Sequence, residues 1–152
     1  MTALSIVSYR ASDQPAFERL NREWIERYFW MEPIDYEVLR HPDKHILAAG
    51  GHIFMALLAD APVGTVALKK VDTDTYEFTK MAVEEDMRGQ KIGEQLALAA
   101  IDWCRAQKAK QVILYSNTKL EPAIRLYQKL GLEEVPLDGP YQRSDIKMKL
   151  IL

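Results

Sequence analysis

The chain has 152 residues, of which 48% are hydrophobic and 28% charged, with a formal net charge of −2, so we expect one soluble globular domain spanning residues 1–152. The near-neutral charge excludes a broad basic surface for nucleic acid, and the apolar runs are too short for membrane spans. The single cysteine, Cys104, excludes an internal disulfide and a multi-cysteine metal site, so we expect a cytoplasmic protein without a metal ion.

The first part of the chain predicts one strand and two helices. Residues 4–10 alternate apolar and polar side chains, as a half-buried strand does. Ser12 or Asp13 is suited to cap a helix with Pro15 in its first turn. Residues 33–40 predict a second, short helix that Pro42 ends.

Three apolar runs follow at strand length, separated by turn clusters. The runs are residues 52–60, 65–71 and 76–83, and the turns lie at 60–64 and 72–75. Such short connections favour an antiparallel arrangement of neighbouring strands.

The second half alternates helix and strand. Helical periodicity covers 92–108, residues 111–116 form a short apolar strand, and Pro122 and Gly131 bound a helix over 122–131. Residues 133–137 and 144–152 predict two closing strands. The order indicates an α/β (α+β) fold with a mixed, mostly antiparallel sheet, one βαβ crossover and flanking helices. A final strand exposed at the sheet edge could pair with a second copy of the chain in a homodimer.

The segment 84–96 places two glycines where the helix over 92–108 begins. The first N–H groups of a helix have no intrahelical partners, and glycine lets a phosphate approach them closely. Arg88 and Lys91 would add positive charge. The alternative is an ordinary strand-to-helix turn that needs one glycine with positive φ. No P-loop or dinucleotide-binding glycine motif is present.

Two segments carry a family resemblance. Arg88 to Gly93 fills the pattern Arg/Gln-x-x-Gly-x-Gly/Ala, except that Lys91 takes the place of the first glycine. Residues 117–135 fill the pattern A-I-x-L-Y-x-K-x-G-F-x-E, with Leu132 at the phenylalanine position. In this order and spacing, both segments resemble the GCN5-related N-acetyltransferase (GNAT) family. Lysine suits position 91 if the residue contributes only its N–H, and does not suit it if the position needs positive φ.

The resemblance implies a site for acetyl-CoA. The pantetheine arm would pair with the strand residues Met81, Ala82 and Val83. Asn117 would hydrogen-bond the cofactor's amide groups, or else is only a turn residue. The pyrophosphate would lie on the amides of the segment Arg88, Gly89, Gln90, Lys91, Ile92, Gly93 and Glu94.

The resemblance also implies two catalytic residues. Tyr127 matches the tyrosine that protonates the departing CoA thiolate, although its helical spacing from Ala123 and Leu130 also suits a core residue. Glu77 is the candidate base for the acceptor amine, although a strand glutamate often faces solvent. Lys80 and Thr79 are weaker candidates for the base.

An excess of aromatic residues precedes the second helix. This region commonly walls the acceptor pocket in the family, so Tyr28, Phe29, Trp30 and Glu32 are predicted to lie near the acceptor. Two residues of the final loop, Tyr141 and Arg143, are predicted to face them from the other side.

The resemblance therefore implies direct transfer of an acetyl group from acetyl-CoA to a primary amine of a small molecule or peptide. One alternative is a non-catalytic acyl-CoA-binding or regulatory module on the same fold. Another is a structural or protein-interaction domain that does not bind coenzyme A.

Overall fold

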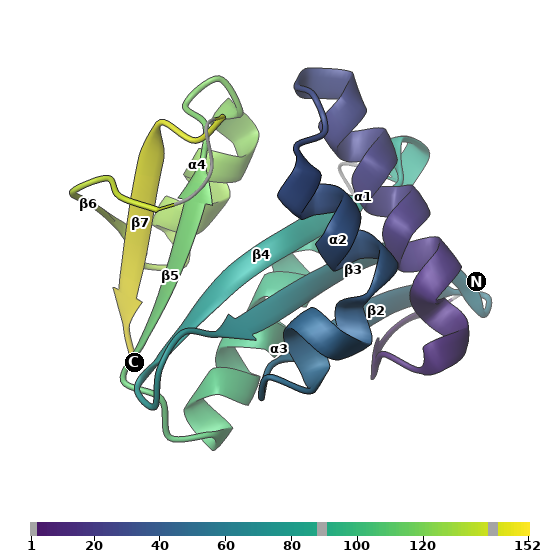
Figure 1. The fold of residues 1–152 in the computed structure, drawn as a ribbon, viewed down its shortest axis with the longest axis horizontal. Coiled ribbons are helices and arrows are strands. Elements are labelled where there is room, and N and C mark those ends of the chain that lie inside the picture. Colours follow the sequence, from purple (N-terminus) through teal and green to yellow (C-terminus); the bar gives the residue numbers. More distant parts are fainter. Residues whose placement is uncertain (1–2, 88–90, 140–142) are drawn as a thin grey trace.

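The computed structural model describes residues 3–87, 91–139 and 143–152, and its core is one sheet of seven strands in the order β1-β2-β3-β4-β5-β7-β6 (Figure 1). The parallel pair is β4 with β5, and the other described pairs are antiparallel, which confirms the predicted mixed sheet. The strands are β1 (Leu4–Ser8), β2 (His52–Leu58), β3 (Ala61–Lys70), β4 (Thr75–Val83), β5 (Gln111–Ser116), β6 (Glu133–Val135) and β7 (Ile146–Ile151).

Proline and glycine set several helix ends as the sequence predicts. Pro15, Pro33 and Pro122 each occupy the first two positions of a helix, where a missing N–H costs nothing. Gly131 follows α4 with a φ of 98°. The helices are α1 (Gln14–Tyr28), α2 (Pro33–Arg40), α3 (Ile92–Ala106) and α4 (Glu121–Lys129), with single turns at Ala11–Asp13, Asp43–Leu47 and Glu85–Met87.

The turn between β2 and β3 is shorter than predicted. It consists of Ala59 and Asp60, both with positive φ (51° and 66°), as in the two-residue turns that suit twisted hairpins. Strand β3 therefore already begins at Ala61 and includes Pro62, which the sequence analysis placed in the turn. A register shift at Ala56 and Leu57 accommodates this proline, which has no N–H for the ladder.

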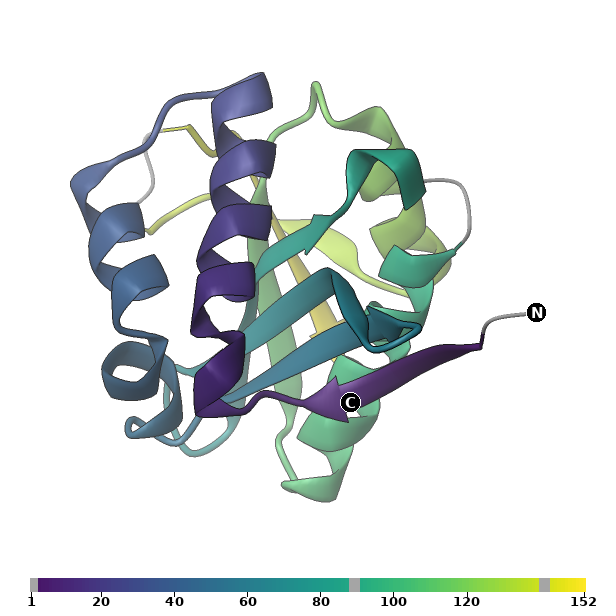
Figure 2. The same ribbon diagram turned by 90° about the vertical axis from the view of Figure 1, so that its right-hand side faces the viewer.

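Helices cover both faces of the sheet (Figure 2). Helices α1 and α2 pack on one face, where Phe17 and Leu39 meet Met55 of β2. On the other face, α3 and α4 bury Leu96 and Tyr127 against Phe78 of β4. The sheet is therefore packed between two layers of helices.

Strands β4 and β5 separate part-way along their length. Their pairing runs from Thr75 with Gln111 to Phe78 with Leu114, although both strands continue beyond these residues. Close to this point, β4 contains a bulge in which Lys80 and Met81 together face Val66, and Lys80 has a φ of 53°. The two strands therefore splay apart beyond Phe78 and Leu114.

The final strand is not an edge strand. Strand β7 lies between β5 and β6 and pairs with both, because β6 folds back onto Lys147–Lys149. The prediction that the last strand is exposed for edge-to-edge pairing is therefore wrong.

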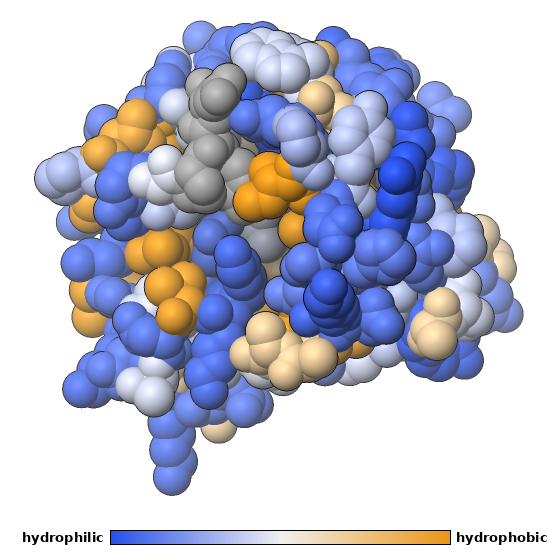
Figure 3. Space-filling model, in the orientation of Figure 1, coloured by the Kyte–Doolittle hydropathy of each residue, from blue (hydrophilic) through white to orange (hydrophobic). Residues whose placement is uncertain are grey.

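In the face shown in Figure 3, hydrophobic side chains form small separate groups on a mainly hydrophilic surface. None of the helices in the described ranges has the length and apolarity to cross a membrane.

Candidate functional site

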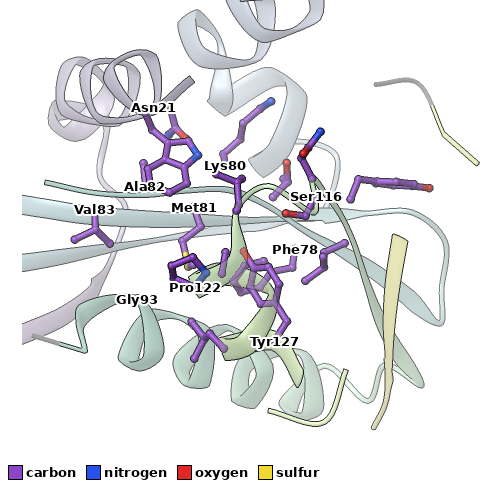
Figure 4. Close-up of a pocket in the computed structure, with 18 of the residues that line it drawn as sticks. Asn21, Phe78, Lys80, Met81, Ala82, Val83, Gly93, Ser116, Pro122 and Tyr127 are labelled. Carbon is purple, nitrogen blue, oxygen red and sulfur yellow. The ribbon is translucent and has the colours of Figure 1, made fainter. Parts of the chain in front are cut away.

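A cavity of about 570 Å³ opens where β4 and β5 separate (Figure 4). Its walls come from α1, from β4 between Glu77 and Val83, from the start of α3, from the ends of β5, and from α4. Arg143 and Ser144, just before β7, complete the lining. A cleft at the carboxyl end of parallel strands is the usual place for a ligand in such folds.

One end of the cavity, here called the cofactor end, combines a strand with a helix start. Six predicted cofactor residues line it: Met81, Ala82, Val83, Ile92, Gly93 and Glu94. Lys91 lines it too, while Arg88, Gly89 and Gln90 lie outside the described residues. The first turn of α3 thus presents its N–H groups at a cavity wall, as an anion site requires.

Gly93 leaves space at this helix start. A Cβ added there would lie 3.7 Å from Cε of Met81 and 3.9 Å from Cδ2 of Leu126, which are ordinary contact distances. Packing within the protein therefore does not require glycine at this position. Glycine leaves the backbone of the first turn of α3 open to the cavity.

Lys91 adopts the left-handed conformation, with φ 60° and ψ 24°, at the N-cap of α3. We expected lysine to be acceptable here only if positive φ was not needed, and that expectation is wrong. The N-cap of α3 therefore takes a conformation that favours glycine, and the lysine bears its steric cost.

Tyr127 belongs both to the core and to the cavity. Its ring packs edge-on against Phe78 with centroids 5.8 Å apart, and the residue is only 8% exposed, yet it lines the cavity. Burial raises the pKa of its hydroxyl, so the group stays protonated. The two readings from the sequence are therefore compatible, and a protonated phenol faces the site.

Glu77 is buried at 6% exposure and lines the cavity, so it is not the solvent-facing strand residue of the alternative interpretation. It precedes Phe78 on β4, at the point where the strands separate. Glu77 on β4 and Tyr127 on α4 thus line one cavity.

The other end of the cavity, here called the acceptor end, receives only some of the predicted acceptor residues. Phe29 and Arg143 line it. Tyr28, Trp30 and Glu32 are not among the described lining residues, and Trp30 is 57% exposed. Tyr141 lies outside the described residues.

Asn117 lines the cavity, but its side-chain amide is already hydrogen-bonded to backbone groups. Its Nδ2 donates to the carbonyl of Arg143 at 2.8 Å, and its Oδ1 accepts the N–H of Lys119 at 3.0 Å. The turn interpretation therefore accounts for these contacts, in which Asn117 ties the end of β5 to the segment before β7.

A buried network of charges adjoins the acceptor end. Lys80 Nζ lies 2.8 Å from Oδ1 of Asp35, and Arg143 contacts both oxygens of Asp35, at 2.6 and 2.8 Å. Arg143 Nη1 also lies 2.5 Å from Oε2 of Glu32. Burial by itself would raise the pKa of Asp35, but hydrogen bonds from Arg143 and the charge of Lys80 lower it to about 2.

A family model described as Acetyltransferase (GNAT) family matches residues 14–132, most of the chain. The chain belongs to the GNAT family. This assignment confirms the resemblance carried by residues 88–93 and 117–135.

Curated GNAT relatives match parts of the chain. A mycothiol acetyltransferase of Saccharomonospora viridis is 39% identical over 68 residues, covering 45% of this chain and 22% of that protein. A Bacillus subtilis protein, provisionally named a ribosomal protein bS18-alanine N-acetyltransferase, is 32% identical over 79 residues, covering 52% of each. The matches thus span about half or less of these relatives.

Solved GNAT structures match the whole fold. An acetyltransferase of the family from Staphylococcus aureus Mu50 superimposes with a TM-score of 0.88 at 21% identity, covering 97% of this chain and 98% of that one. The protein yncA from Salmonella typhimurium, solved with its cofactor acetyl-CoA, has a TM-score of 0.79 at 14% identity and coverage of 98% and 94%. At these identities the likeness establishes the fold.

Several lining residues of this GNAT chain were not predicted from the sequence. Asn21 and Trp24 reach the cavity from α1, and Tyr115 reaches it from β5. Helical spacing alone could not identify Trp24 as a cavity residue, because a cavity wall and a core have the same apolar periodicity. Asn21, 1% exposed with Nδ2 bonded to the carbonyl of Phe17, was detectable only as a polar residue on the apolar face of α1.

No group of His, Cys, Asp and Glu side chains in the described part of this GNAT chain is arranged to hold a metal ion. Cys104 is buried in the core, and burial raises the pKa of its thiol to about 12. The described lining of the cavity presents backbone amides, the phenol of Tyr127, carboxylates and the cations Lys80 and Arg143.

Proposed function

We propose that the protein is an N-acetyltransferase that transfers an acetyl group directly from acetyl-CoA to a primary amine of a small molecule or peptide. The observation that carries this proposal is the single cavity shared by the β4 backbone, the first turn of α3, Glu77 and Tyr127. The family assignment supports the class of reaction.

The cofactor end has the features that acetyl-CoA needs. The backbone of Met81–Val83 lines the open side of the splay, where a pantetheine arm can pair as an added strand. The space beside Gly93 and the amides of the first turn of α3 suit the pyrophosphate. Acetyl-CoA supplies an activated thioester, and these groups orient it.

The catalytic step then divides between two side chains. Glu77 removes a proton from the acceptor ammonium, directly or through water, so that the neutral amine can attack the thioester carbonyl. A backbone N–H of Met81–Val83 donates to the carbonyl oxygen as negative charge develops. A C–N bond forms, the C–S bond breaks, and Tyr127 donates its proton to the departing sulfur. The nitrogen then loses its extra proton, which returns Tyr127 to its neutral form and leaves the neutral amide. Holding both reactants in one cavity provides much of the rate enhancement.

The names of the relatives support an amine acceptor without identifying it. One relative is named for mycothiol and another for an alanine of a ribosomal protein, so the names of these two relatives cover both a small-molecule and a protein acceptor. Both kinds of acceptor remain within the proposal.

Two measurements test the proposal in sequence. Calorimetry with acetyl-CoA should detect binding to the cavity, and a thiol-release assay over a panel of amines and peptides should detect turnover. Native Cys104 does not interfere, since its thiol is buried and protonated. Binding without turnover on any amine would favour the non-catalytic module, and absence of binding would leave a structural or interaction domain.

The role of Tyr127 has its own test. The substitution Tyr127→Phe keeps the ring contact with Phe78 and removes only the proton donor. We expect kcat to fall about 10²- to 10⁴-fold with little change in acetyl-CoA affinity, as for other general acids. The control is Tyr36→Phe on α2, a residue absent from the described cavity lining. An unchanged kcat in Tyr127→Phe would assign this tyrosine to the core alone.

A further inference from the structure

The charges at the acceptor end of the cavity bear on which amines can enter. Two cations, Lys80 and Arg143, line this end, and Glu77 lines it beside them. In many binding sites, such cations would be the natural partners of a substrate carboxylate. Whether they can act in this way depends on what already holds them.

Both cations are already bound by one buried carboxylate. Asp35 is 0% exposed and contacts the Lys80 ammonium and two nitrogens of the Arg143 guanidinium, all within 2.8 Å. Its Oδ2 also accepts the backbone N–H of Glu32 at 2.9 Å. Four donors therefore converge on this carboxylate, and it offsets much of the positive charge that Lys80 and Arg143 could offer to a substrate carboxylate.

The balance of charge at this end also opposes an incoming carboxylate. Three carboxylates, of Asp35, Glu32 and Glu77, stand against the two cations of Lys80 and Arg143, so these five described groups sum to −1. All five are largely removed from water, where screening is weak.

Lys119 stands outside this count of lining residues, although its Nζ lies 4.1 Å from the centroid of the Phe29 ring. The same Nζ donates to the carbonyl of Tyr28 at 2.6 Å. At the cofactor end, Lys129 lies 2.7 Å from Glu94, and Arg125 and Lys91 line the wall near the first turn of α3. The cations at that end are placed to meet phosphate groups.

The uncharged walls of the acceptor end favour an apolar body on the substrate. Trp24 and Phe29 line this end from the α1 side, and Tyr115 lines it from β5. Aromatic walls attract both rings and ammonium groups.

We propose that the acceptor is a cationic amine with an apolar body and no carboxylate on the carbon that carries the amino group. This inference rests on the proposed acetyl transfer and narrows its substrate class. A small arylalkylamine and the N-terminal residue of a peptide both have this chemistry, and a free amino acid does not.

The wild-type protein tests this with matched substrates. Phenethylamine, phenylalaninamide and phenylalanine are compared in the thiol-release assay over a pH series, so that rates refer to the neutral amine. We expect kcat/KM for the first two to exceed that for phenylalanine at least 10-fold. A higher kcat/KM for phenylalanine than for the other two substrates would overturn the inference. An equally low kcat/KM for phenylalaninamide and phenylalanine would also overturn it, because the size of the substituent, and not its charge, would then explain the discrimination. A short peptide with a phenylalanine N-terminus distinguishes peptide from small-molecule acceptors.

Variants test whether the network causes the discrimination. Asp35→Asn removes the carboxylate that holds Lys80 and Arg143, so the preference for phenylalaninamide over phenylalanine should fall at least 10-fold. Glu32→Gln changes the charge with less disturbance and should lower the same ratio in the same direction. The control Asp102→Asn lies on α3 with a side chain 76% exposed and should leave the ratio unchanged. An unchanged ratio in a folded Asp35→Asn and in Glu32→Gln would overturn the inference.

The two levels of proposal fail differently. If acetyl-CoA binds and no amine, amide or amino acid releases thiol, the proposed transfer is wrong and the inference falls with it. If amines are acetylated but the ratio between amide and amino acid is near one, the proposed function stands and only the substrate class is wrong.

Discussion

At the scale of single residues, Lys91 shows how this chain departs from the glycine pattern of its family. A non-glycine residue at φ 60° costs on the order of 1 kcal/mol, because Cβ approaches the following carbonyl oxygen. Unlike glycine, the lysine places a positive charge at the cavity wall. Backbone strain and side-chain charge therefore act at one position and can be separated by substitution.

We predict that Lys91→Gly is more stable than Lys91→Ala by about 1 kcal/mol, since only glycine relieves the positive φ. Urea unfolding of both variants measures the difference. Both variants lose the ammonium group, so any weakening of acetyl-CoA binding caused by charge should be equal in the two. Equal stabilities would mean that the turn before α3 relaxes when the lysine is replaced.

At the scale of elements, β4 and α3 supply different parts of the cavity wall. Strand β4 carries Glu77, the bulge at Lys80 and the Met81–Val83 backbone in succession along one cavity wall. Helix α3 contributes only its first turn, where Gly93 leaves room beside the backbone amides. A methyl group at this position should therefore affect the helix and the ligand in opposite directions.

We predict that Gly93→Ala stabilises the protein by about 0.5 to 1 kcal/mol, because alanine favours helix and meets only ordinary contacts. The same methyl group should weaken acetyl-CoA binding at least 10-fold by occupying the space proposed for pyrophosphate. Urea unfolding and calorimetry provide the two measurements. Gln95→Ala, at an exposed position two residues further along α3 and absent from the described lining, is the control. Unchanged affinity in Gly93→Ala would move the phosphate site away from α3.

At the scale of the whole molecule, features that lie within one stretch of sequence could be predicted, whereas contacts between residues far apart in the sequence could not. The strand–turn–helix around Lys91 and the motif around Tyr127 each lie within one stretch of sequence, so their residues could be identified from spacing. Asp35 could not, because it meets Lys80 and Arg143 from 45 and 108 positions away. Only packing of α2 against the β4 bulge and the segment before β7 brings these charges together.

The same network should make the stability of the whole fold depend on pH. Asp35 has an ordinary pKa of 3.8 when unfolded and about 2 when folded, so the folded state favours its ionised form. The stabilisation is full above about pH 5 and is lost as the pH falls through the folded value. From this shift it amounts to about 2 kcal/mol.

We therefore predict that the free energy of unfolding of the wild-type protein falls between pH 6 and pH 2.5 by about 1 to 2 kcal/mol more than that of Asp35→Asn. Asparagine cannot ionise, so the variant, although less stable at neutral pH, lacks this contribution to the slope. Urea unfolding across the pH series measures both curves, and Asp102→Asn should follow the wild-type slope because its exposed carboxylate has no comparable partners. Parallel curves for the wild type and Asp35→Asn would mean that Arg143 and Lys80 hold this carboxylate no better than water does.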